Sequence, residues 1–524
     1  GMGVAGEREA PDGTVVGVGN SVSGGAFHAP VVQAGTLNGG MHTYYGQQPP
    51  SGLPPVADWP RLDAADPIAS GVRRTRRIGD EPPLPPYVAR DGDGVLKERV
   101  RTAARSGGLV LVTGEPLSGK SRTAWAAMLT NLPGTTRFLA PAAGTDLRGL
   151  PAVLRGRGED RCVIWLDELE GCLGDHGLTP ALLAELVRLR VPVIATMSDE
   201  AYDAHRFGGQ ARARVLVGVD PVELSRAWTK DEQGRLREAI EDLRLGDVYY
   251  WSGGTDTAAF LAVGPELWDE WWRARRPNAH PHGHLLVRVA MDLARCGTDD
   301  TAVPSSLLRE LCALYEQEAA QAAGESFEDA LAWASKVRHG VTGLLVPGAE
   351  PDSWRCFASL HRDAVSRPDA PPVPLNLWLH ALEAVRGDPD LRELVVDCAQ
   401  SELERVADGR PEVGLVLGRL YEATGQAQYA EDWFRHSADA GGVEAAGIVG
   451  RALADRGQVV PAITYLERAA EAGDADARTD LALLLADRAV YWLDRLGESG
   501  DEGAQGAADM LRALVKTPPD TVEE

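Results

Sequence analysis

The chain has 524 residues, of which 44% are hydrophobic and 25% are charged, and its formal net charge is −24. This length predicts about three or four domains, and the acidic surface argues against a nucleic-acid partner. No apolar run is long enough for a membrane span and no secretory signal pattern opens the chain, so we expect a cytoplasmic protein. Six scattered cysteines without a Cys-x-x-Cys pair favour reduced thiols over disulfides or a zinc site.

The first segment, residues 1–46, is rich in glycine, and no charged residue occurs from Gly13 to Ala57. SVSGGAFH (21–28) and TLNGGMHT (36–43) align at an offset of 15 residues. Two short β-runs joined by glycine turns are therefore expected, and without charge nothing opposes their stacking with identical chains. The alternative is a disordered glycine-rich tail.

Residues 47–86 contain QQPPSGLPP and EPPLPP, which is typical of an extended linker. We expect residues 1–86 not to pack on the core. The basic cluster VRRTRR (72–77) fits a solvated part of this linker better than a nucleic-acid contact.

Strands alternating with helices predict an α/β domain over residues 87–220, with a parallel sheet covered on both faces. Helices are expected at 95–105 and 123–132, and a further helix starts with Thr179 as cap and Pro180 in its first turn. The five expected strands are LVLVT (109–113), RFLA (137–140), CVIWL (162–166), VPVIATM (191–197) and VLVGV (215–219).

GEPLSGKS (114–121) fits the phosphate-binding loop (P-loop) motif G-x-x-x-x-G-K-[ST] between an expected strand and helix. Its amides and the helix N-terminus direct positive dipoles at an anion, which predicts ATP or ADP as ligand. Lys120 is expected to reach the β- and γ-phosphates and Ser121 to ligate Mg²⁺. The predicted phosphate-binding residues are Gly114, Glu115, Pro116, Leu117, Ser118, Gly119, Lys120 and Ser121.

VIWLDE places Asp167 and Glu168 at the end of the third expected strand. Asp167 is expected to hold Mg²⁺ through water, and Glu168 to polarise the attacking water as a general base. The adjacent pair favours an extra strand between this one and the P-loop strand, which we assign to VPVIATM. Candidates for sensing the γ-phosphate are Thr196 and Ser198 at its end, followed by Arg206, Arg212 and Arg214, for which surface arginine is the alternative.

After residue 221 helical spacing dominates. Thr229 and Glu232 have the spacing of a capping box. Residues 221–300 are expected to form a helical lid, and 301–374 a winged-helix-like module in which VTGLLVP (341–347) and WRCFAS (354–359) supply the wing.

Residues 375–524 contain a repeat. AEDWFRHSADAGG (430–442) aligns with AITYLERAAEAGD (462–474), and GQ at 425–426 recurs at 457–458, both at a spacing of 32. A shortened third copy is expected at 489–501. Helix pairs of this kind stack into a solenoid. They resemble tetratricopeptide (TPR) or Sel1-like repeats, which bind proteins; a purely structural array is the alternative.

The segment PPYVARD (85–91), the P-loop, the Asp-Glu pair, the lid, the winged module and the repeats together resemble STAND-class NTPases, the NLR-like signalling ATPases related to AAA+ proteins. The resemblance implies a switch in which ADP holds a closed monomer and ATP supports an open oligomer. It places Val88 and Arg90 beside the adenine, with Pro281 and His282 as lid contacts. Ser198 stands where relatives commonly have Arg, which puts rapid hydrolysis in doubt.

VQAGTLNGGM (32–41) resembles the core of RHIM-like amyloid signalling motifs, through Val32, Gln33, Gly35, Leu37 and Asn38. This implies a protein effector with a similar β-motif as partner. The sequence thus favours an ATP-binding switch that self-associates and recruits an effector in bacterial immunity or programmed cell death, with a protein or ligand trigger at the repeats. Alternatives are an AAA+-like protein-remodelling ATPase and an ATP-dependent transcriptional regulator.

Overall fold

The computed structural model describes residues 52–76, 81–208, 213–298 and 301–516. The predicted β-motif at residues 32–38 and the candidate Arg212 lie outside these ranges. The chain forms two compact units. The first contains Gly92–Gly114, Thr123–Glu223 and the described residues up to Gly71, and the second contains Val72–Asp91, Glu115–Arg122 and the chain from Leu224 onward.

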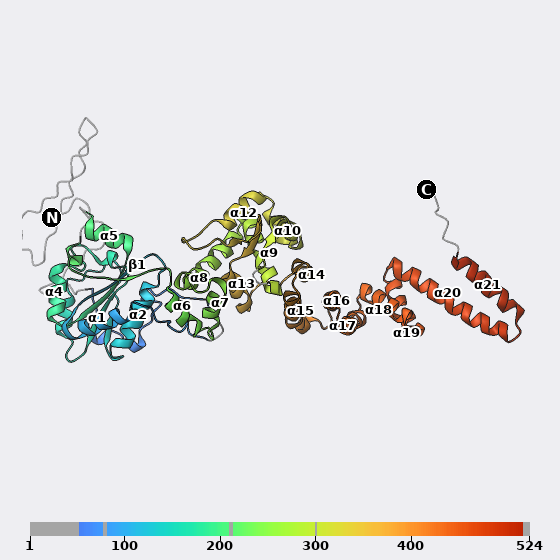
Figure 1. Cartoon of the computed structure of the whole chain (residues 1–524), viewed down its shortest axis with the longest axis horizontal. Helices are drawn as coiled ribbons and strands as arrows, with labels where there is room; N and C mark the ends of the chain where they lie inside the picture. The colour runs from blue at the N-terminus through green and yellow to red at the C-terminus, as the bar shows by residue number, and fades with distance from the viewer. Residues whose placement is uncertain (1–51, 77–80, 209–212, 299–300, 517–524) are drawn as a thin grey trace, which may run out of the picture. The chain divides into compact units, whose positions relative to one another are not determined.

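A five-stranded sheet in the order β2-β3-β4-β1-β5 organises the first unit. Figure 1 shows this sheet, with β1 labelled, among the helices of the unit. Its strands are β1 (Gly108–Gly114), β2 (Arg137–Leu139), β3 (Cys162–Leu166), β4 (Pro192–Ser198) and β5 (Val222–Leu224). β4 pairs in parallel with both β1 and β3, so the extra strand predicted between the P-loop strand and the Asp-Glu strand is confirmed. The parallel strands are almost fully apolar because both faces of the sheet are covered.

Each face of the sheet has its own helices, which are α1 (Asp93–Ser106), α2 (Lys120–Asn131), α3 (Leu150–Arg155), α4 (Pro180–Arg188) and α5 (Asp199–Phe207). On one face Trp125 of α2 makes edge contacts with Phe138 and Trp165. On the other, Leu182 and Leu186 of α4 join a core with the alternate strand residues. Thr179 caps α4 through Leu182 N, and Pro180 opens the helix, as predicted.

The fifth strand is not where the sequence predicted it. VLVGV (215–219) begins in a 3₁₀ turn, Arg214–Leu216, whose Val215 and Leu216 are buried in the core. A short apolar run satisfies burial equally well as a turn or a strand, since periodicity does not separate the two. Val222–Leu224 supplies the fifth strand instead.

The prediction that residues up to 86 do not pack on the core is wrong for the described part. We call residues 52–71 the strap. Its Leu53, Val56 and Trp59 join the sheet core on the α4 face, and Leu62 is also buried. Its backbone then pairs with the chain around β2: Leu62 N donates to Thr136 O at 2.8 Å and Phe138 N donates to Pro60 O at 2.9 Å.

The described part of the basic cluster, residues 72–76, belongs to the second unit, where its arginines pair with acids although Arg73 and Arg74 stay 55% and 62% exposed. Arg73 and Arg74 lie 3.8 and 3.5 Å from Glu266 and Asp269 of α8. Arg76 forms an ion pair with Asp247 of α7. The lid helices are α6 (Lys230–Arg237), α7 (Leu243–Ser252), α8 (Thr257–Ala274) and α9 (Pro281–Leu293), the last followed by a π-helical turn, Ala294–Thr298.

Among the described residues, a small three-stranded sheet and four α-helices form the winged-helix-like module. The strands have the order β6-β8-β7 and are antiparallel. The elements are β6 (Val303–Pro304), α10 (Ser305–Leu311), a 3₁₀ turn (Cys312–Leu314), α11 (Glu316–Ala322), α12 (Phe327–Ser335), β7 (Leu345–Pro347), β8 (Ser353–Cys356) and α13 (Ala358–Ser366).

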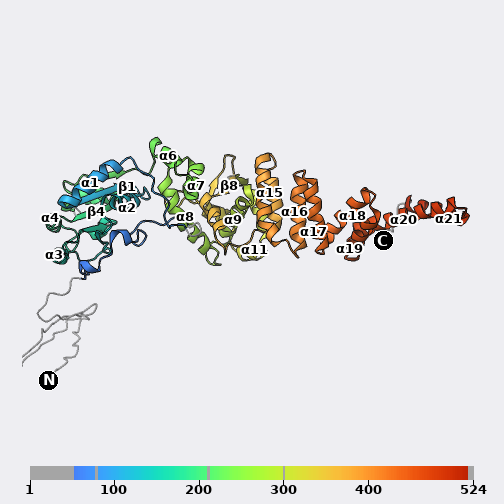
Figure 2. The ribbon, with the colours of Figure 1, turned by 90° about the horizontal axis from the view of Figure 1, so that it is seen from below.

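The repeats form successive helices that stack on their neighbours (Figure 2). They are α14 (Leu375–Ala384), α15 (Pro389–Leu403), α16 (Pro411–Ala423), α17 (Ala427–Asp439), α18 (Val443–Asp455), α19 (Val459–Glu471), α20 (Ala475–Glu498) and α21 (Glu502–Lys516). The pairs α16–α17 and α18–α19 repeat at the predicted spacing of 32. A Cβ at Gly418 or Gly450 would lie 2.5 Å from Phe434 or 2.7 Å from Leu466, so small residues let each pair approach.

The predicted third copy is not a separate helix. The turns between paired helices use Gly425 and Gly457, with φ of 78° and 74°. In the shortened copy, Leu484 takes the place of Gly457; leucine favours helix, and α20 continues through it. Among the described helices, none combines the length and apolar character that a bilayer crossing requires.

Candidate functional site

The P-loop connects β1 to α2, which begins at Lys120. Leu117 and Gly119 have φ of 62° and 93°, an alternation that turns successive backbone N–H groups toward one side. Lys120 Nζ donates to Glu115 O at 2.9 Å, so the lysine folds back along its own loop. Ser118 Oγ is buried and accepts or donates no hydrogen bond among the described residues. Such a loop suits an anion with several oxygens.

The acidic pair follows β3 as predicted, and Thr196 of β4 holds it. Thr196 Oγ1 donates to Asp167 Oδ1 at 2.7 Å and accepts from Glu168 N at 3.1 Å. Glu168 adopts φ of 54°, a left-handed conformation that is uncommon outside glycine. Its side chain is exposed, whereas Asp167 is half-buried. Parallel strands bring their carboxyl ends to one edge, so β3 presents this pair at the sheet edge to which β1 delivers the loop.

The fold is that of a P-loop NTPase. The strand order, the glycine-containing loop and the Asp-Glu strand next to β4 decide this. Ser121 and Asp167 each carry an oxygen donor of the kind that Mg²⁺ prefers, since this ion takes hard oxygen ligands and retains waters.

The sensor candidates have local structural roles. Thr196 orients Asp167 and Glu168, as described. Ser198 Oγ accepts from Ala201 N at 3.1 Å and caps α5. The Arg206 guanidinium lies 5.1 Å from the Phe207 ring on the same helix, and Arg214 opens the 3₁₀ turn with an exposed side chain.

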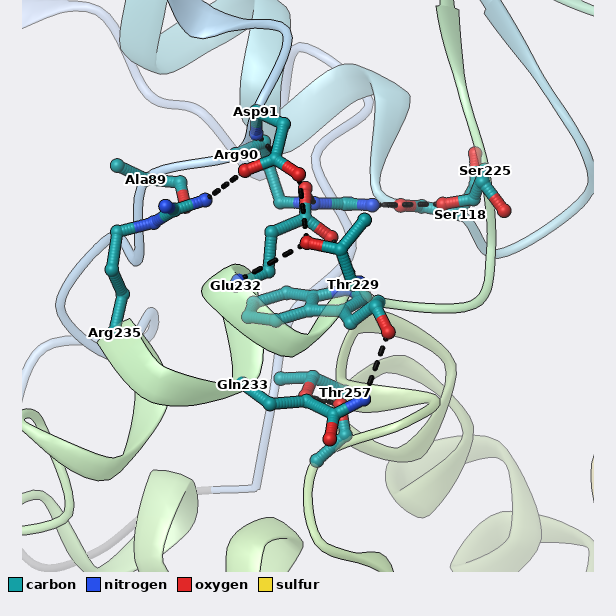
Figure 3. A network of polar contacts seen from close by, with 12 residues as sticks. Ala89, Arg90, Asp91, Ser118, Ser225, Thr229, Glu232, Gln233, Arg235 and Thr257 are labelled. Carbon is teal, nitrogen blue, oxygen red and sulfur yellow. Dashed lines mark hydrogen bonds and ion pairs between the residues drawn. The ribbon is translucent and has the colours of Figure 1, made fainter.

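In the second unit, Arg90 links three segments of chain (Figure 3). Its guanidinium donates to Glu232 Oε1 at 2.8 Å, to Ser118 O of the P-loop at 3.0 Å and to Ser225 O at 2.8 Å. It also lies 4.7 Å above the Trp228 ring. Arg90 therefore ties the P-loop backbone to the start of the lid.

The predicted capping box at the start of α6 is confirmed. The Glu232 carboxylate closes this capping box and also pairs with Arg90. Glu232 Oε2 accepts from Thr229 N at 2.9 Å, while Oε1 accepts from Arg90 and from Asp91 N. Arg235 first and Thr229 second donate to Asp91 and hold the pKa of that carboxyl below its usual value. The sequence pointed to Arg90 and to the capping box, but not to the ion pair between Arg90 and Glu232. It also did not indicate the contact of Trp228 with Arg90 or the bond from Arg235 to Asp91.

The other candidates lie at two further places. Val88 is buried in the core of the second unit. Pro281 is buried in the first turn of α9. His282 N donates to Glu325 Oε2 at 2.8 Å, and its ring Nδ1 lies 2.9 Å from Glu325 O. Glu325, between α11 and α12, thus caps α9. The structure brings Arg90 to the P-loop and His282 to the winged module.

The repeats carry an apolar groove between α19 and α20. Its lining residues are Val459, Leu484, Asp487, Arg488, Tyr491 and Trp492. The side chains of Tyr491 and Trp492 are more than half exposed, at 52% and 55%. This groove offers aromatic side chains together with both signs of charge, from Asp487 and Arg488.

Two of the solved structures that are similar to this chain are ATPases. No family model and no curated protein matches the chain. A Signal Transduction ATPase with Numerous Domains (STAND) protein with a tetratricopeptide repeat sensor from Pyrococcus horikoshii is 12% identical; the match covers 82% of this chain and 74% of that one, with a TM-score of 0.22. A Walker-type ATPase of Pyrococcus abyssi is 14% identical over 57% of this chain and 99% of that one, with a TM-score of 0.23.

Proposed function

We propose that the chain is an ATP-binding signalling switch of the STAND type. One observation carries this proposal. A P-loop with positive φ at Leu117 and Gly119 follows β1, and in the same sheet Asp167 and Glu168 follow β3. Thr196 of β4 is hydrogen-bonded to Asp167. The lid, the winged-helix-like module and the helical repeats that follow in the same chain support the signalling class over a free-standing ATPase.

Each P-loop and strand-end residue has a distinct part in nucleotide binding. The loop amides and the N-terminus of α2 receive the phosphates, and Lys120 turns from Glu115 O to the β- and γ-phosphates. Ser121 and Asp167 would hold Mg²⁺, which would supply positive charge to neutralise the phosphates. Glu168 orients the attacking water from its exposed position, because the bond from its N–H to Thr196 fixes the backbone there.

We propose that hydrolysis is slow. Ser198, where a phosphate-sensing arginine is common in the resembling class, is engaged in capping α5. Arg206 and Arg214 have local surroundings on the surface of the first unit. A switch that persists in its ATP state needs no rapid turnover.

The output of the switch is proposed from the sequence resemblance. ATP supports self-association, which gathers the RHIM-like segments around Val32–Asn38 so that they recruit an effector with a similar β-motif. Bacterial immunity or programmed cell death is the setting that such a pairing fits. The trigger is a protein bound at the repeats, where the groove at Tyr491 and Trp492 offers apolar and charged contacts together.

Nucleotide content and mass of the purified chain test the proposal. We expect bound ADP or ATP in the wild type, and a larger assembly with ATP than with ADP. Lys120→Ala should contain no nucleotide and should not form the larger assembly. Lys97→Ala is the matched control, because Lys97 is an exposed lysine of α1. A wild-type chain free of nucleotide that does not bind added ATP contradicts the proposal.

The turnover number separates the switch from a remodelling ATPase. Steady-state hydrolysis well above about one per second favours the remodelling alternative. For the amyloid-like output, a peptide of residues 13–46 is expected to form thioflavin-positive fibrils. A peptide that stays monomeric at high concentration removes that part of the proposal and leaves the nucleotide switch in place.

A further inference from the structure

The strap ends against the strand that carries the acidic pair. Trp165 Nε1 of β3 donates to Ser70 O at 2.7 Å. The last residues of the strap form a bonded turn, in which Gly71 N donates to Ile68 O at 3.1 Å and Ser70 Oγ donates to Asp66 O at 2.8 Å. Trp165 thus contacts this turn from within β3, and Asp167, which follows the end of β3, lies against its Gly71.

Gly71 lies directly on the Asp167 carboxylate. A Cβ built on Gly71 would be 2.1 Å from Asp167 Oδ2 and 2.8 Å from Cγ, so no other residue fits without displacement. The φ of Gly71 is 102°, which also requires glycine. The backbone of Gly71 therefore covers one side of Oδ2, while Oδ1 accepts the Thr196 hydroxyl.

The chain also leaves the first unit at this residue. Gly71 is the last strap residue of the first unit, and Val72 begins the second. The next residues are held within the second unit by the ion pairs of Arg73, Arg74 and Arg76. The contact on Asp167 is thus made by the residue at which the chain passes from one unit to the other.

We propose that the strap is a latch that responds to the metal: Mg²⁺ bound with the nucleotide at Asp167 releases Gly71 from that carboxylate. Mg²⁺ requires regular octahedral geometry and usually keeps several waters, so an ion held through water needs room beside the carboxylate oxygens. Gly71 takes part of that room at Oδ2. The inference rests on the proposed function and adds the regulation of its site, since the occupancy of the metal position is passed to the segment that leads back to the N-terminal residues.

Hydrogen exchange of the wild-type chain tests the latch without a mutation. We compare the protein saturated with ADP in EDTA and the protein saturated with ADP and Mg²⁺. Amides of residues 66–71 are expected to exchange faster with Mg²⁺, because the turn loosens from β3. Equal exchange in the two conditions overturns the latch.

Affinity for Mg²⁺ provides the reciprocal test, because coupling between two events acts equally in both directions. Trp165→Phe keeps a ring in the core and removes the donor to Ser70 O. In ADP-saturated protein it should tighten Mg²⁺ binding by up to about fivefold, the scale of one lost hydrogen bond. Trp125→Phe is the control, because Trp125 contacts the Trp165 ring at 5.5 Å but does not hold the strap in this way.

The outcomes separate the two proposals. If ADP binds and Trp165→Phe matches the wild type in Mg²⁺ affinity, or changes it no more than Trp125→Phe does, the latch is wrong and the nucleotide site stands. If the wild-type chain binds no ADP with or without Mg²⁺, both are wrong. Tighter Mg²⁺ binding in Trp165→Phe alone, with faster wild-type exchange at 66–71, supports the latch.

Discussion

At the scale of single residues, burial decides how much a charged side chain contributes. Arg90 and Arg235 both bond the segment before the P-loop to α6. The side chains of the Arg90–Glu232 pair are 3% and 4% exposed, whereas those of Arg235 and Asp91 are 34% and 46% exposed. Solvent screens the second pair, and breaking the first leaves a carboxylate without its cation in the interior.

We therefore expect Arg90→Ala to lower the free energy of unfolding by about 3 to 5 kcal/mol. Arg235→Ala, in the last turn of α6, should cost less than about 1 kcal/mol. Urea unfolding of both variants measures the difference. Equal losses would contradict a special part for Arg90 in joining the P-loop to the lid.

Asp363 of α13 gives the stability a pH dependence of its own. Burial, opposed by Arg367, raises the pKa of Asp363 from 3.8 to about 6. A raised folded pKa means that this carboxyl stabilises the fold below about pH 4, and that the contribution is lost as the pH rises through about 6. Asp363→Asn should be more stable than the wild type by about 3 kcal/mol at pH 7.5, and the gain should fall to about half at pH 5. Chemical unfolding at the two pH values measures it, and a gain independent of pH is the contrary result.

At the scale of elements, the sequence correctly predicted the helices and strands whose ends are marked by nearby residues. The cap and proline of α4, the capping box of α6 and the apolar run of β3 lie within a few residues of the ends they define. The strap was missed because proline content suggested a linker. Its buried Leu53, Val56, Trp59 and Leu62 are nevertheless spaced three apart, which is the signal that composition concealed.

The strap is expected to behave as part of the core. Trp59 is 1% exposed, so Trp59→Ala should cost about 3 to 5 kcal/mol. Asp58→Ala, next to it on the exposed side of the strap, should change stability by less than about 0.5 kcal/mol. Thermal unfolding compares the two, and a harmless Trp59→Ala would return the segment to being a linker.

The repeat glycines make a second prediction for elements. Gly450→Val forces the Leu466 side chain of α19 to move, since a Cβ at Gly450 already lies 2.7 Å from it. Such overpacking costs about 1 to 3 kcal/mol. Gly506→Val on α21 is the matched control, because a Cβ there meets nothing within 4 Å. A cost for Gly506→Val as large as for Gly450→Val would show that helix propensity, not packing, sets the effect.

The candidate nucleotide site, like the helices and strands, could be predicted from the sequence only where its residues belong to a local pattern. Lys120, Ser121, Asp167 and Glu168 follow from a motif and a strand end, which are local. The hydrogen bond from Thr196 to Asp167 and the contact between Gly71 and Asp167 depend on which strands and segments meet in space. One sequence without the fold does not contain that information.

At the scale of the whole molecule, the described residues form two separate hydrophobic cores. One joins the sheet, α3, α4 and the strap, and the other runs from the lid to the repeats. Chains with separate cores usually unfold in more than one step. Calorimetry should resolve two transitions, of which Trp59→Ala lowers one and Gly450→Val lowers the other. A single transition shifted by both variants would mean that the units unfold together.

The pairing of the strap beside β2 also affects the edge of the sheet, where a further strand could add. The outer strand of a sheet is a template on which an extended segment adds, and uncharged β-branched sequence is what adds most readily. Residues 13–46 have that composition and stand immediately before the strap in the chain. At Pro60 and Leu62 the strap itself already fills the template beside β2. An extended segment therefore finds this edge of the sheet already occupied by the strap.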